Sequence, residues 1–179
     1  MNKTIIPVIL SLLLIISCGR NSQPLEEGWK QHTDEKYSVQ YPSDWEFDEP
    51  DREELIFTIQ SPLSSDSDQF RENVSLVFQD LTGMEVTLDQ YTVISLNQFK
   101  RIISNGKIIE SSRYSANGTE FQKVIFLTQQ DTGSNKLQVE QRYYLQDKAA
   151  LILSFACDSS ELVNFKETGE KILNSFRLE

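Results

Sequence analysis

The chain has 179 residues, 27 acidic against 17 basic side chains, and a formal net charge of −10 at neutral pH. This length suits one domain with a sizeable core, so neither a disulfide nor a metal is needed for stability. The acidic balance disfavours nucleic acid and anionic lipid headgroups as partners, because both are bound through patches of Lys and Arg.

The start of the chain has the pattern of a secretory signal. Lys3 supplies a positive charge, and residues 5–16 are apolar apart from Pro7 and Ser11. This run is too short to cross a bilayer, which needs ~20 apolar residues. We therefore expect residues 1–17 to be a signal peptide that is removed.

The segment Ile15-Ile16-Ser17-Cys18 resembles the lipobox of bacterial lipoproteins, with Ile15 where Leu is usual. The resemblance implies cleavage before Cys18 and attachment of acyl chains to its thiol. Because each buried methylene contributes ~0.8 kcal/mol, these chains would hold the protein at a membrane in the cell envelope, outside the cytoplasm. With Gly19 after the cysteine in place of Asp, the segment resembles lipoproteins that Gram-negative cells send to the outer membrane. An ordinary signal peptide with a chance cysteine is the alternative.

Residues 18–36 are polar and acidic, with Leu25 and Trp29 as the large apolar residues. Such a segment buries too little apolar surface to offset the entropy lost on ordering. We expect a flexible tether that carries the lipidated Cys18, with Trp29 as a candidate anchor for a partner. His32, the single histidine, is expected to be solvated.

The folded domain is predicted to span residues 37–179. Alternation of apolar and polar residues predicts strands at 37–41, 55–60 and 73–80, and Trp45 and Phe47 continue this pattern. Four more strands are expected at 107–115, 120–130, 136–146 and 149–157. The Asn117-Gly118 pair predicts a hairpin between the first two of these four, so we expect an antiparallel meander.

Two helices complete the prediction. Thr87 to Gln90 fits a capping box, and the first helix is expected to end at Asn105-Gly106 in the left-handed conformation. Its apolar face is formed by Leu88, Tyr91, Phe99, Ile102 and Ile103. The second helix is expected to be capped by Asp158 and Glu161. Its apolar face is formed by Leu162, Phe165, Ile172, Leu173 and Phe176. The fold class is α+β, an α/β/α sandwich with helices on both faces of a twisted antiparallel sheet.

The segment Tyr37-Ser38-Val39-Gln40-Tyr41-Pro42-Ser43-Asp44-Trp45 resembles the opening signature of the PsbP-like family. Later segments agree in order: Phe57-Thr58-Ile59, Val74-Ser75-Leu76-Val77, the helix opening near Leu88 and Tyr91, and Ile172-Leu173-Asn174-Ser175-Phe176. The resemblance covers residues 37–176. It implies an α/β/α sandwich and binding or accessory work. The metal sites of the photosynthetic member do not map onto a motif in this sequence.

The sequence offers no recognisable catalytic motif, so we expect no catalytic residues, no metal site and no cofactor. The acidic run from Asp44 to Glu54 and the pair Asp66 and Asp68 lack the spacing of a calcium loop, and we interpret them as solvated. Cys157 ends an apolar strand and is expected to be a small buried hydrophobe. Trp29, Tyr41 and Trp45 are candidates for binding a partner, although alternation favours a core position for the last two.

These observations favour a non-enzymatic, lipid-anchored envelope protein that serves as an accessory or binding subunit of an envelope complex. Its expected partners are the membrane, through Cys18, and an envelope protein. A carrier of a small apolar ligand or a cation is the alternative, and an enzyme of unrecognised type ranks third.

Overall fold

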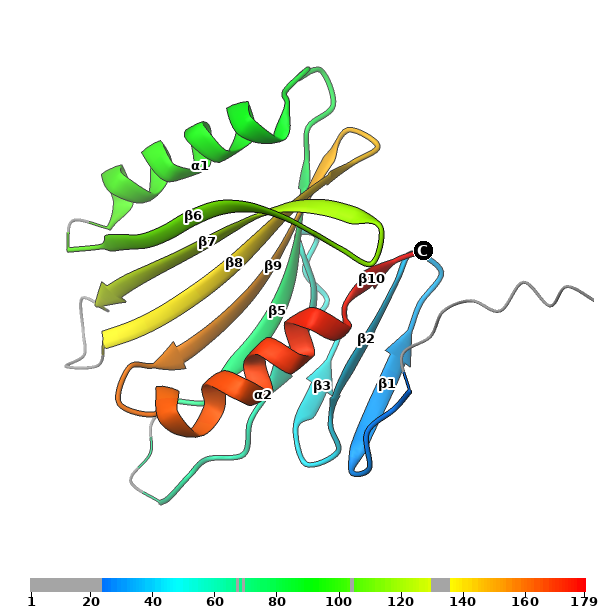
Figure 1. Cartoon of the computed structure of the whole chain (residues 1–179), viewed down its shortest axis with the longest axis vertical. Coiled ribbons are helices and arrows are strands. Elements are labelled where there is room, and N and C mark those ends of the chain that lie inside the picture. Colours follow the sequence, from blue (N-terminus) through cyan, green and yellow to red (C-terminus); the bar gives the residue numbers. More distant parts are fainter. Residues whose placement is uncertain (1–23, 67, 69, 104, 130–135) are drawn as a thin grey trace, which may run out of the picture.

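The computed structural model describes residues 24–66, 68, 70–103, 105–129 and 136–179. The predicted signal peptide and Cys18 lie outside the described residues. The described part consists of ten strands and two helices, and Figure 1 shows their arrangement. The elements are β1 (Trp29–Thr33), β2 (Tyr37–Pro42), β3 (Glu46–Asp48), β4 (Leu55–Gln60), β5 (Asn73–Asp80), α1 (Leu88–Ile102), β6 (Lys107–Ala116), β7 (Thr119–Gln129), β8 (Lys136–Gln146), β9 (Ala149–Asp158), α2 (Leu162–Ser175) and β10 (Arg177–Leu178).

The strands form two antiparallel sheets. Seven strands form the large sheet in the order β3-β4-β5-β9-β8-β7-β6, and the small sheet has the order β1-β2-β10. The α+β class and the antiparallel meander of β6 to β9 are confirmed. The expectation of a single sheet is wrong, because β2 pairs with β1 and β10. Alternation predicts that a strand exists and which face it buries, but not its neighbour in the sheet.

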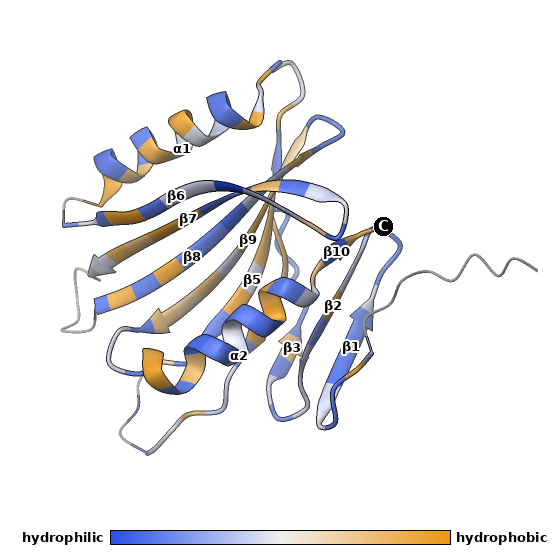
Figure 2. Ribbon diagram, viewed as in Figure 1, coloured by the Kyte–Doolittle hydropathy of each residue, from blue (hydrophilic) through white to orange (hydrophobic). Residues whose placement is uncertain are grey.

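The tether predicted over residues 18–36 is shorter, because Trp29–Thr33 form strand β1 and pair with residues 38–42 of β2. Figure 2 shows why composition missed this strand, since β1 is coloured hydrophilic over most of its length. Its stabilisation comes from backbone hydrogen bonds to β2, which composition does not record. The folded part therefore begins at Trp29 and not at Tyr37.

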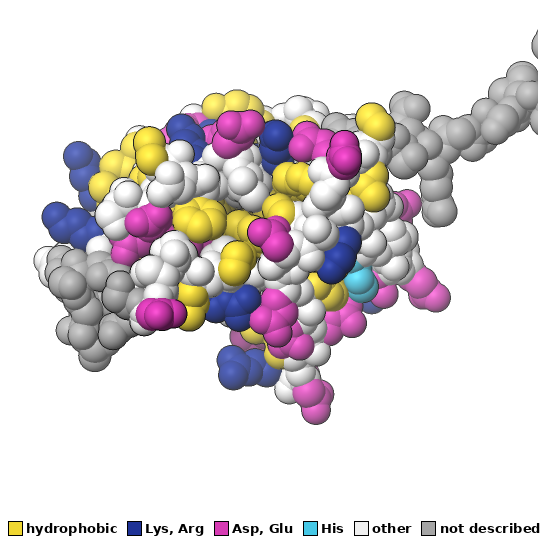
Figure 3. All heavy atoms as spheres, turned by 90° about the horizontal axis from the view of Figure 1, so that it is seen from below, with side chains coloured by type: hydrophobic (Ala, Val, Ile, Leu, Met, Phe, Trp, Pro, Cys, Tyr) yellow, Lys and Arg dark blue, Asp and Glu magenta, His cyan; other side chains and the backbone are white. Residues whose placement is uncertain are grey.

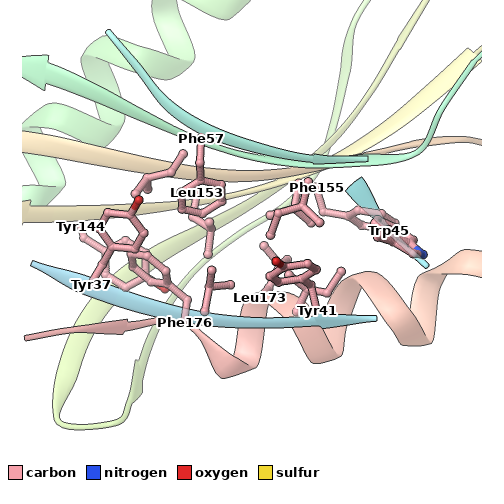
Figure 4. Close-up of a cluster of buried hydrophobic side chains, with 14 of the residues drawn as sticks. Tyr37, Tyr41, Trp45, Phe57, Tyr144, Leu153, Phe155, Leu173 and Phe176 are labelled. Atoms are coloured by element: carbon pink, nitrogen blue, oxygen red, sulfur yellow. The ribbon is translucent and has the colours of Figure 1, made fainter. Parts of the chain in front are cut away.

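The larger hydrophobic cluster, which we call the aromatic core, lies between the large sheet and the layer formed by α2 and the small sheet (Figure 4). Tyr37 packs against Phe57 with ring centroids 5.3 Å apart, and Tyr144 packs against Phe176 at 5.5 Å. Its buried members are Tyr37, Val39, Tyr41, Trp45, Phe57, Ile59, Val74, Leu76, Phe121, Tyr144, Leu153, Phe155, Cys157, Ile172, Leu173 and Phe176. Each large apolar side chain buried here contributes roughly 1.5–3 kcal/mol relative to exposure.

The second hydrophobic cluster joins α1 to the large sheet. Tyr91 of α1 meets Tyr143 of β8 edge to face, and Phe99 packs against Phe126 of β7. Leu153 and Phe155 of β9 belong to the aromatic core, whereas the alternate residues Ala150 and Ile152 belong to this second cluster. Because successive residues of a strand point to opposite sides, the two clusters contain residues from different faces of β9. The predicted sandwich did not include the small sheet, which packs together with α2 on the aromatic core.

The predicted turns and caps agree in part with the structure. Thr87 forms the predicted capping box with Gln90, and Asn117 has the left-handed φ of 54° expected in its hairpin. The predicted left-handed end of α1 is wrong, because the C-cap residue Ile103 is extended and Gly106 does not have a positive φ. A Cβ atom at Gly106 would lie 2.9 Å or less from Phe99 and Ile103. Close packing, and not a left-handed turn, therefore requires glycine there.

Two helix predictions differ in detail. Ile102 was expected on the buried face of α1 but is 80% exposed, because the helix ends at this residue. Glu161 is the N-cap of α2, yet its side chain makes no capping hydrogen bond. Asp158 instead accepts hydrogen bonds from the backbone and hydroxyl of Ser160 in the preceding turn. Among the described residues, no helix is long and apolar enough to cross a membrane.

Candidate functional site

The three aromatic residues predicted to bind a partner are not equally accessible. Tyr41 and Trp45 are buried in the aromatic core with 8% and 5% of their surface exposed, so they do not form a binding surface. Trp29 is half-buried in β1 and packs against the same core. The alternation of their strands correctly favoured a core position for Tyr41 and Trp45. The side chain of Trp29, which was predicted to be an exposed anchor, is therefore only partly accessible to a partner.

A buried polar cluster lies where the loop before β5 meets the end of β9. Glu72 is 1% exposed, and its carboxylate accepts hydrogen bonds from the Ser61 hydroxyl at 3.3 Å and the Asp158 backbone N–H at 3.4 Å. The Cys157 thiol lies 3.9 Å from the same carboxylate. Sequence reasoning placed Cys157 in the core correctly but missed Glu72. A buried acid directly before an apolar strand has no local pattern that reveals its partners.

This cluster has the electrostatics of a closed interior. Burial raises the pKa of Glu72 above its ordinary value, and burial, with the nearby Glu72 and Asp158 carboxylates, raises the pKa of Cys157 to about 12. At neutral pH Cys157 is therefore a protonated thiol, which is a poor nucleophile. The cluster joins Ser61 and Glu72 to the end of β9, and its thiol and carboxylate are buried away from solvent.

A second buried polar group closes the C-terminal end of α2. The guanidinium of Arg142 donates to the Glu140 carboxylate at 2.9 Å and to the Leu173 carbonyl at 3.1 Å. The Asn117 amide, at the tip of the β6–β7 hairpin, donates to the carbonyls of Asn174 and Phe176, both at 3.3 Å. These contacts satisfy carbonyls that a helix end leaves without intrahelical partners. Sequence reasoning identified the hairpin but gave no sign of this contact.

The pocket at this helix end is small. It is lined by Arg142, Tyr144, Asn117 and Asn174 among others, and its volume of about 10 Å³ is that of one water molecule. Burial raises the pKa of Tyr144 to about 12, so its hydroxyl stays protonated. This pocket between α2 and the sheet therefore does not admit the small apolar ligand expected of a carrier.

Two other pockets are larger and more open. One of about 160 Å³ lies between the segment before α1 and the β8–β9 hairpin, with Leu81, Met84 and Leu145 in its wall. The other, a groove of about 430 Å³, is lined by Arg52, Glu53, Glu54, Leu55 and Val77. The volume of the groove falls within the range of small-molecule sites.

His32 lies in β1 and not in a solvated tether. Its ring stacks on Phe47 at 4.2 Å, and its Nε2 atom is 3.3 Å from a carboxylate oxygen of Glu49. Figure 3 shows the histidine (cyan) at the surface beside acidic side chains. Tyr37 donates a hydrogen bond to the same carboxylate at 3.3 Å. His32 and Glu49 thus join the small sheet to the chain that follows β3.

Among the described residues, no three His, Cys, Asp or Glu side chains are placed to hold a metal ion. Asp68, one of the acids considered for calcium, instead accepts hydrogen bonds from the backbone N–H groups of Ser64 and Phe70. These bonds lower the pKa of Asp68. Glu46, in the acidic run, pairs with Arg71 at 2.9 Å.

These features define an α+β domain of two antiparallel sheets in which the buried Glu72 and Arg142 hydrogen-bond to groups inside the protein. No protein-family model matches the chain, and no curated protein matches its sequence. Solved structures are similar to it in fold, among them the PsbP of the cyanobacterium Synechocystis, with a TM-score of 0.63 at 12% identity and coverage of 92% of this chain and 99% of the other. The fold of this chain is therefore PsbP-like, as the residues around Tyr37 to Trp45 predicted.

Two further similar structures come from different bacteria. LpqN of Mycobacterium tuberculosis, described as involved in cell envelope biogenesis, has a TM-score of 0.60 at 9% identity, with coverage of 84% and 91%. PA94 of Pseudomonas aeruginosa, a protein of unknown function described as a putative regulator, has a TM-score of 0.58 at 11% identity, with coverage of 82% and 94%. At sequence identities this low, the structural similarity establishes a shared fold only, and function has to be argued separately.

Proposed function

We propose that this chain is a non-enzymatic, lipid-anchored protein of the cell envelope that serves as an accessory or binding subunit of an envelope complex. The observation that carries the proposal is a lipobox-like segment, residues 15–18, ahead of a PsbP-like domain. The likeness to LpqN, a protein described as involved in cell envelope biogenesis, supports an envelope role. The proposed location is outside the cytoplasm, at the outer membrane if the host is Gram-negative.

The buried chemistry of the domain supports binding rather than catalysis. Glu72 and Arg142 are satisfied by neighbours inside the protein, and Cys157 stays protonated at neutral pH. Polar groups that are paired and buried stabilise a fold but offer no group to a substrate. A partner would therefore meet the outer surface.

The proposed anchor leaves the domain room to move. Ten residues separate Cys18 from Trp29, and each adds at most roughly 3.5 Å, so the first strand can stand up to ~35 Å from the acylated residue. This reach lets the domain contact a neighbouring envelope protein or the bilayer itself.

Membrane fractionation of intact cells tests the anchor. The wild-type protein should sediment with membranes, and Cys18→Ala should move to the soluble fraction. Cys157→Ala is the matched control, because it removes the other cysteine of the chain from a buried position. An unchanged membrane fraction for Cys18→Ala would contradict lipid anchoring.

Cross-linking in intact cells, followed by purification from detergent extract, tests the accessory role. One or two envelope proteins should co-purify with the wild-type protein and be depleted from the Cys18→Ala sample. Co-purification that is equal for both forms would show that the anchor does not bring the partners together. An empty result at good expression would contradict the accessory role.

The groove lined by Leu55 and Val77 favours the second candidate, a carrier of a small ligand or a cation. Its volume of about 430 Å³ is sufficient, and Arg52, Glu53 and Glu54 place charges at its wall. Native mass spectrometry of residues 24–179 tests this function. A reproducible added mass that Val77→Trp removes would support a carrier, and a bare domain would oppose it.

A further inference from the structure

One stretch of the chain is positively charged, although the chain as a whole is acidic. Residues 90–109 contain Lys100, Arg101 and Lys107 and no acidic residue, although the chain as a whole has 27 acidic residues and a net charge of −10. Asp89, the acid in the first turn of α1, is already paired with Arg113. None of the three cations forms an ion pair with a described residue. The C-terminal half of α1 and the start of β6 therefore carry a local charge of +3.

Apolar side chains are exposed on the same stretch. Ile102 is 80% exposed at the end of α1, and Ile109 of β6 is 50% exposed. Val93 and Ile94, further back on α1, are 58% and 39% exposed. Figure 1 shows that the end of α1 and the start of β6 lie next to each other. We call these four apolar residues and the three cations the α1–β6 surface.

The exposure of these apolar side chains bears on what fits the surface. None of the four lines a pocket described above, and they are between 39% and 80% exposed. A rigid protein partner would need matching pockets for projecting aliphatic groups. A bilayer interface needs none, because headgroups and acyl chains rearrange around an inserted side chain. Aliphatic residues flanked by Lys and Arg are typical of helices that lie on anionic membranes.

We propose that the α1–β6 surface binds the anionic headgroups of a phospholipid bilayer, with Ile102 and Ile109 inserted among the acyl chains. This contact refines the sequence prediction, in which the acidic total disfavoured anionic headgroups, because the local charge is opposite to the total. The proposal draws on the proposed function only for the presence of a membrane. Its test omits Cys18, so failure of one leaves the other standing.

The test uses residues 24–179, which contain every strand, both helices and both hydrophobic clusters. Vesicles of phosphatidylcholine alone and of phosphatidylcholine mixed with phosphatidylglycerol are sedimented with the protein, and circular dichroism confirms that each variant is folded. We expect binding to the anionic vesicles and none to the neutral ones. Binding should weaken as salt is added, because ions screen exposed charges.

Two variants examine the surface directly. Each cation near an anionic bilayer strengthens binding roughly fivefold, so Lys100→Glu with Arg101→Glu should weaken it at least tenfold. Ile102→Asp should also weaken it, because a charge replaces the inserted group. Lys166→Glu and Val163→Asp on α2 are the matched controls, since Lys166 is exposed and Val163 is 93% exposed.

Three results would overturn the proposal. These are no binding to anionic vesicles, equal losses in the α1 and α2 variants, or equal binding to neutral vesicles. If vesicles fail but cross-links from the α1–β6 surface reach an acidic protein, the surface binds a protein and the bilayer contact is wrong.

Discussion

Gly169 of α2 is the position where one added methyl group should disturb the fold most clearly. The helix passes so close to β9 that a Cβ atom at Gly169 would lie 2.6 Å or less from three atoms of the Phe155 ring. Phe155 is 4% exposed within the aromatic core, so its ring has little room to withdraw. Gly169→Ala should therefore push α2 away from the sheet.

Two opposing effects set the size of the change. Overpacking a well-filled core costs about 1–3 kcal/mol, and the low end does not apply because three ring atoms are involved. Replacing Gly by Ala inside a helix recovers ~1 kcal/mol of intrinsic propensity. We expect Gly169→Ala to lower the free energy of unfolding by about 1–2 kcal/mol, and the Tm by roughly 3–6 °C for a domain of this size.

Thermal and urea denaturation of residues 24–179 measure this effect. Phe155→Leu removes the ring, so Gly169→Ala should cost much less in that background, with a coupling of about 1 kcal/mol or more between the two positions. Glu167→Ala, on the exposed side of the same helix, should be close to neutral. If Gly169→Ala melts at or above the temperature of the wild type, the close approach of α2 and β9 is not what requires glycine.

Three further predictions concern buried and turn residues. Burial raises the folded pKa of Glu72 above its ordinary value near 4.5, so the stability contributed by protonated Glu72 is lost as pH rises through the folded pKa. The free energy of unfolding, measured by urea denaturation between pH 4 and pH 8, should therefore change less with pH in Glu72→Gln than in the wild type. Parallel pH profiles for the two proteins would contradict the raised pKa. Cys157, with its pKa raised to about 12, should not react with a thiol reagent at pH 7.5 in the folded domain and should react fully in urea, and rapid labelling of the folded protein would show that the thiol is accessible. Asn117→Ala should lower the free energy of unfolding by about 1–2 kcal/mol, because it removes the amide donor to two carbonyls and places Ala at a positive φ; Asn117→Gly, which keeps the turn, should recover part of this loss, and equal stability of both variants would mean that the turn conformation contributes nothing.

The sequence predicted most elements because their signals are local. The strands at residues 55–60 and 73–80 have the predicted bounds, and Thr87 caps α1 as its spacing with Gln90 indicates. The fold family also followed from local residues, since the motif around Tyr37 to Trp45 is a strand and a turn. These features depend on neighbours within a few positions, which a sequence displays directly.

The remaining features depend on contacts between distant residues. Strand β1 has a hydrophilic composition and is held by backbone pairing with β2, so its residues looked like a tether. Glu72 is buried against Asp158 of β9, and Arg142 is buried against the Leu173 carbonyl of α2, so both depend on residues far away in the sequence. Glu140, another partner of Arg142, is a near neighbour on the same strand. The α1–β6 surface was missed for a related reason. The net charge adds up every charged residue of the chain, so it does not show that one stretch is positive.

The small sheet makes the two ends of the folded chain depend on each other. Strand β2 lies between β1, the first strand, and β10, the last, and the Ser175 hydroxyl contacts the Gln40 backbone across 135 positions. Contacts over such separations form slowly, because a long loop must close before they contribute. During synthesis β2 therefore keeps one open edge until the final residues emerge. A chain that stops before Phe176 would expose that edge together with the unfilled aromatic core, and edges of this kind are where chains associate wrongly.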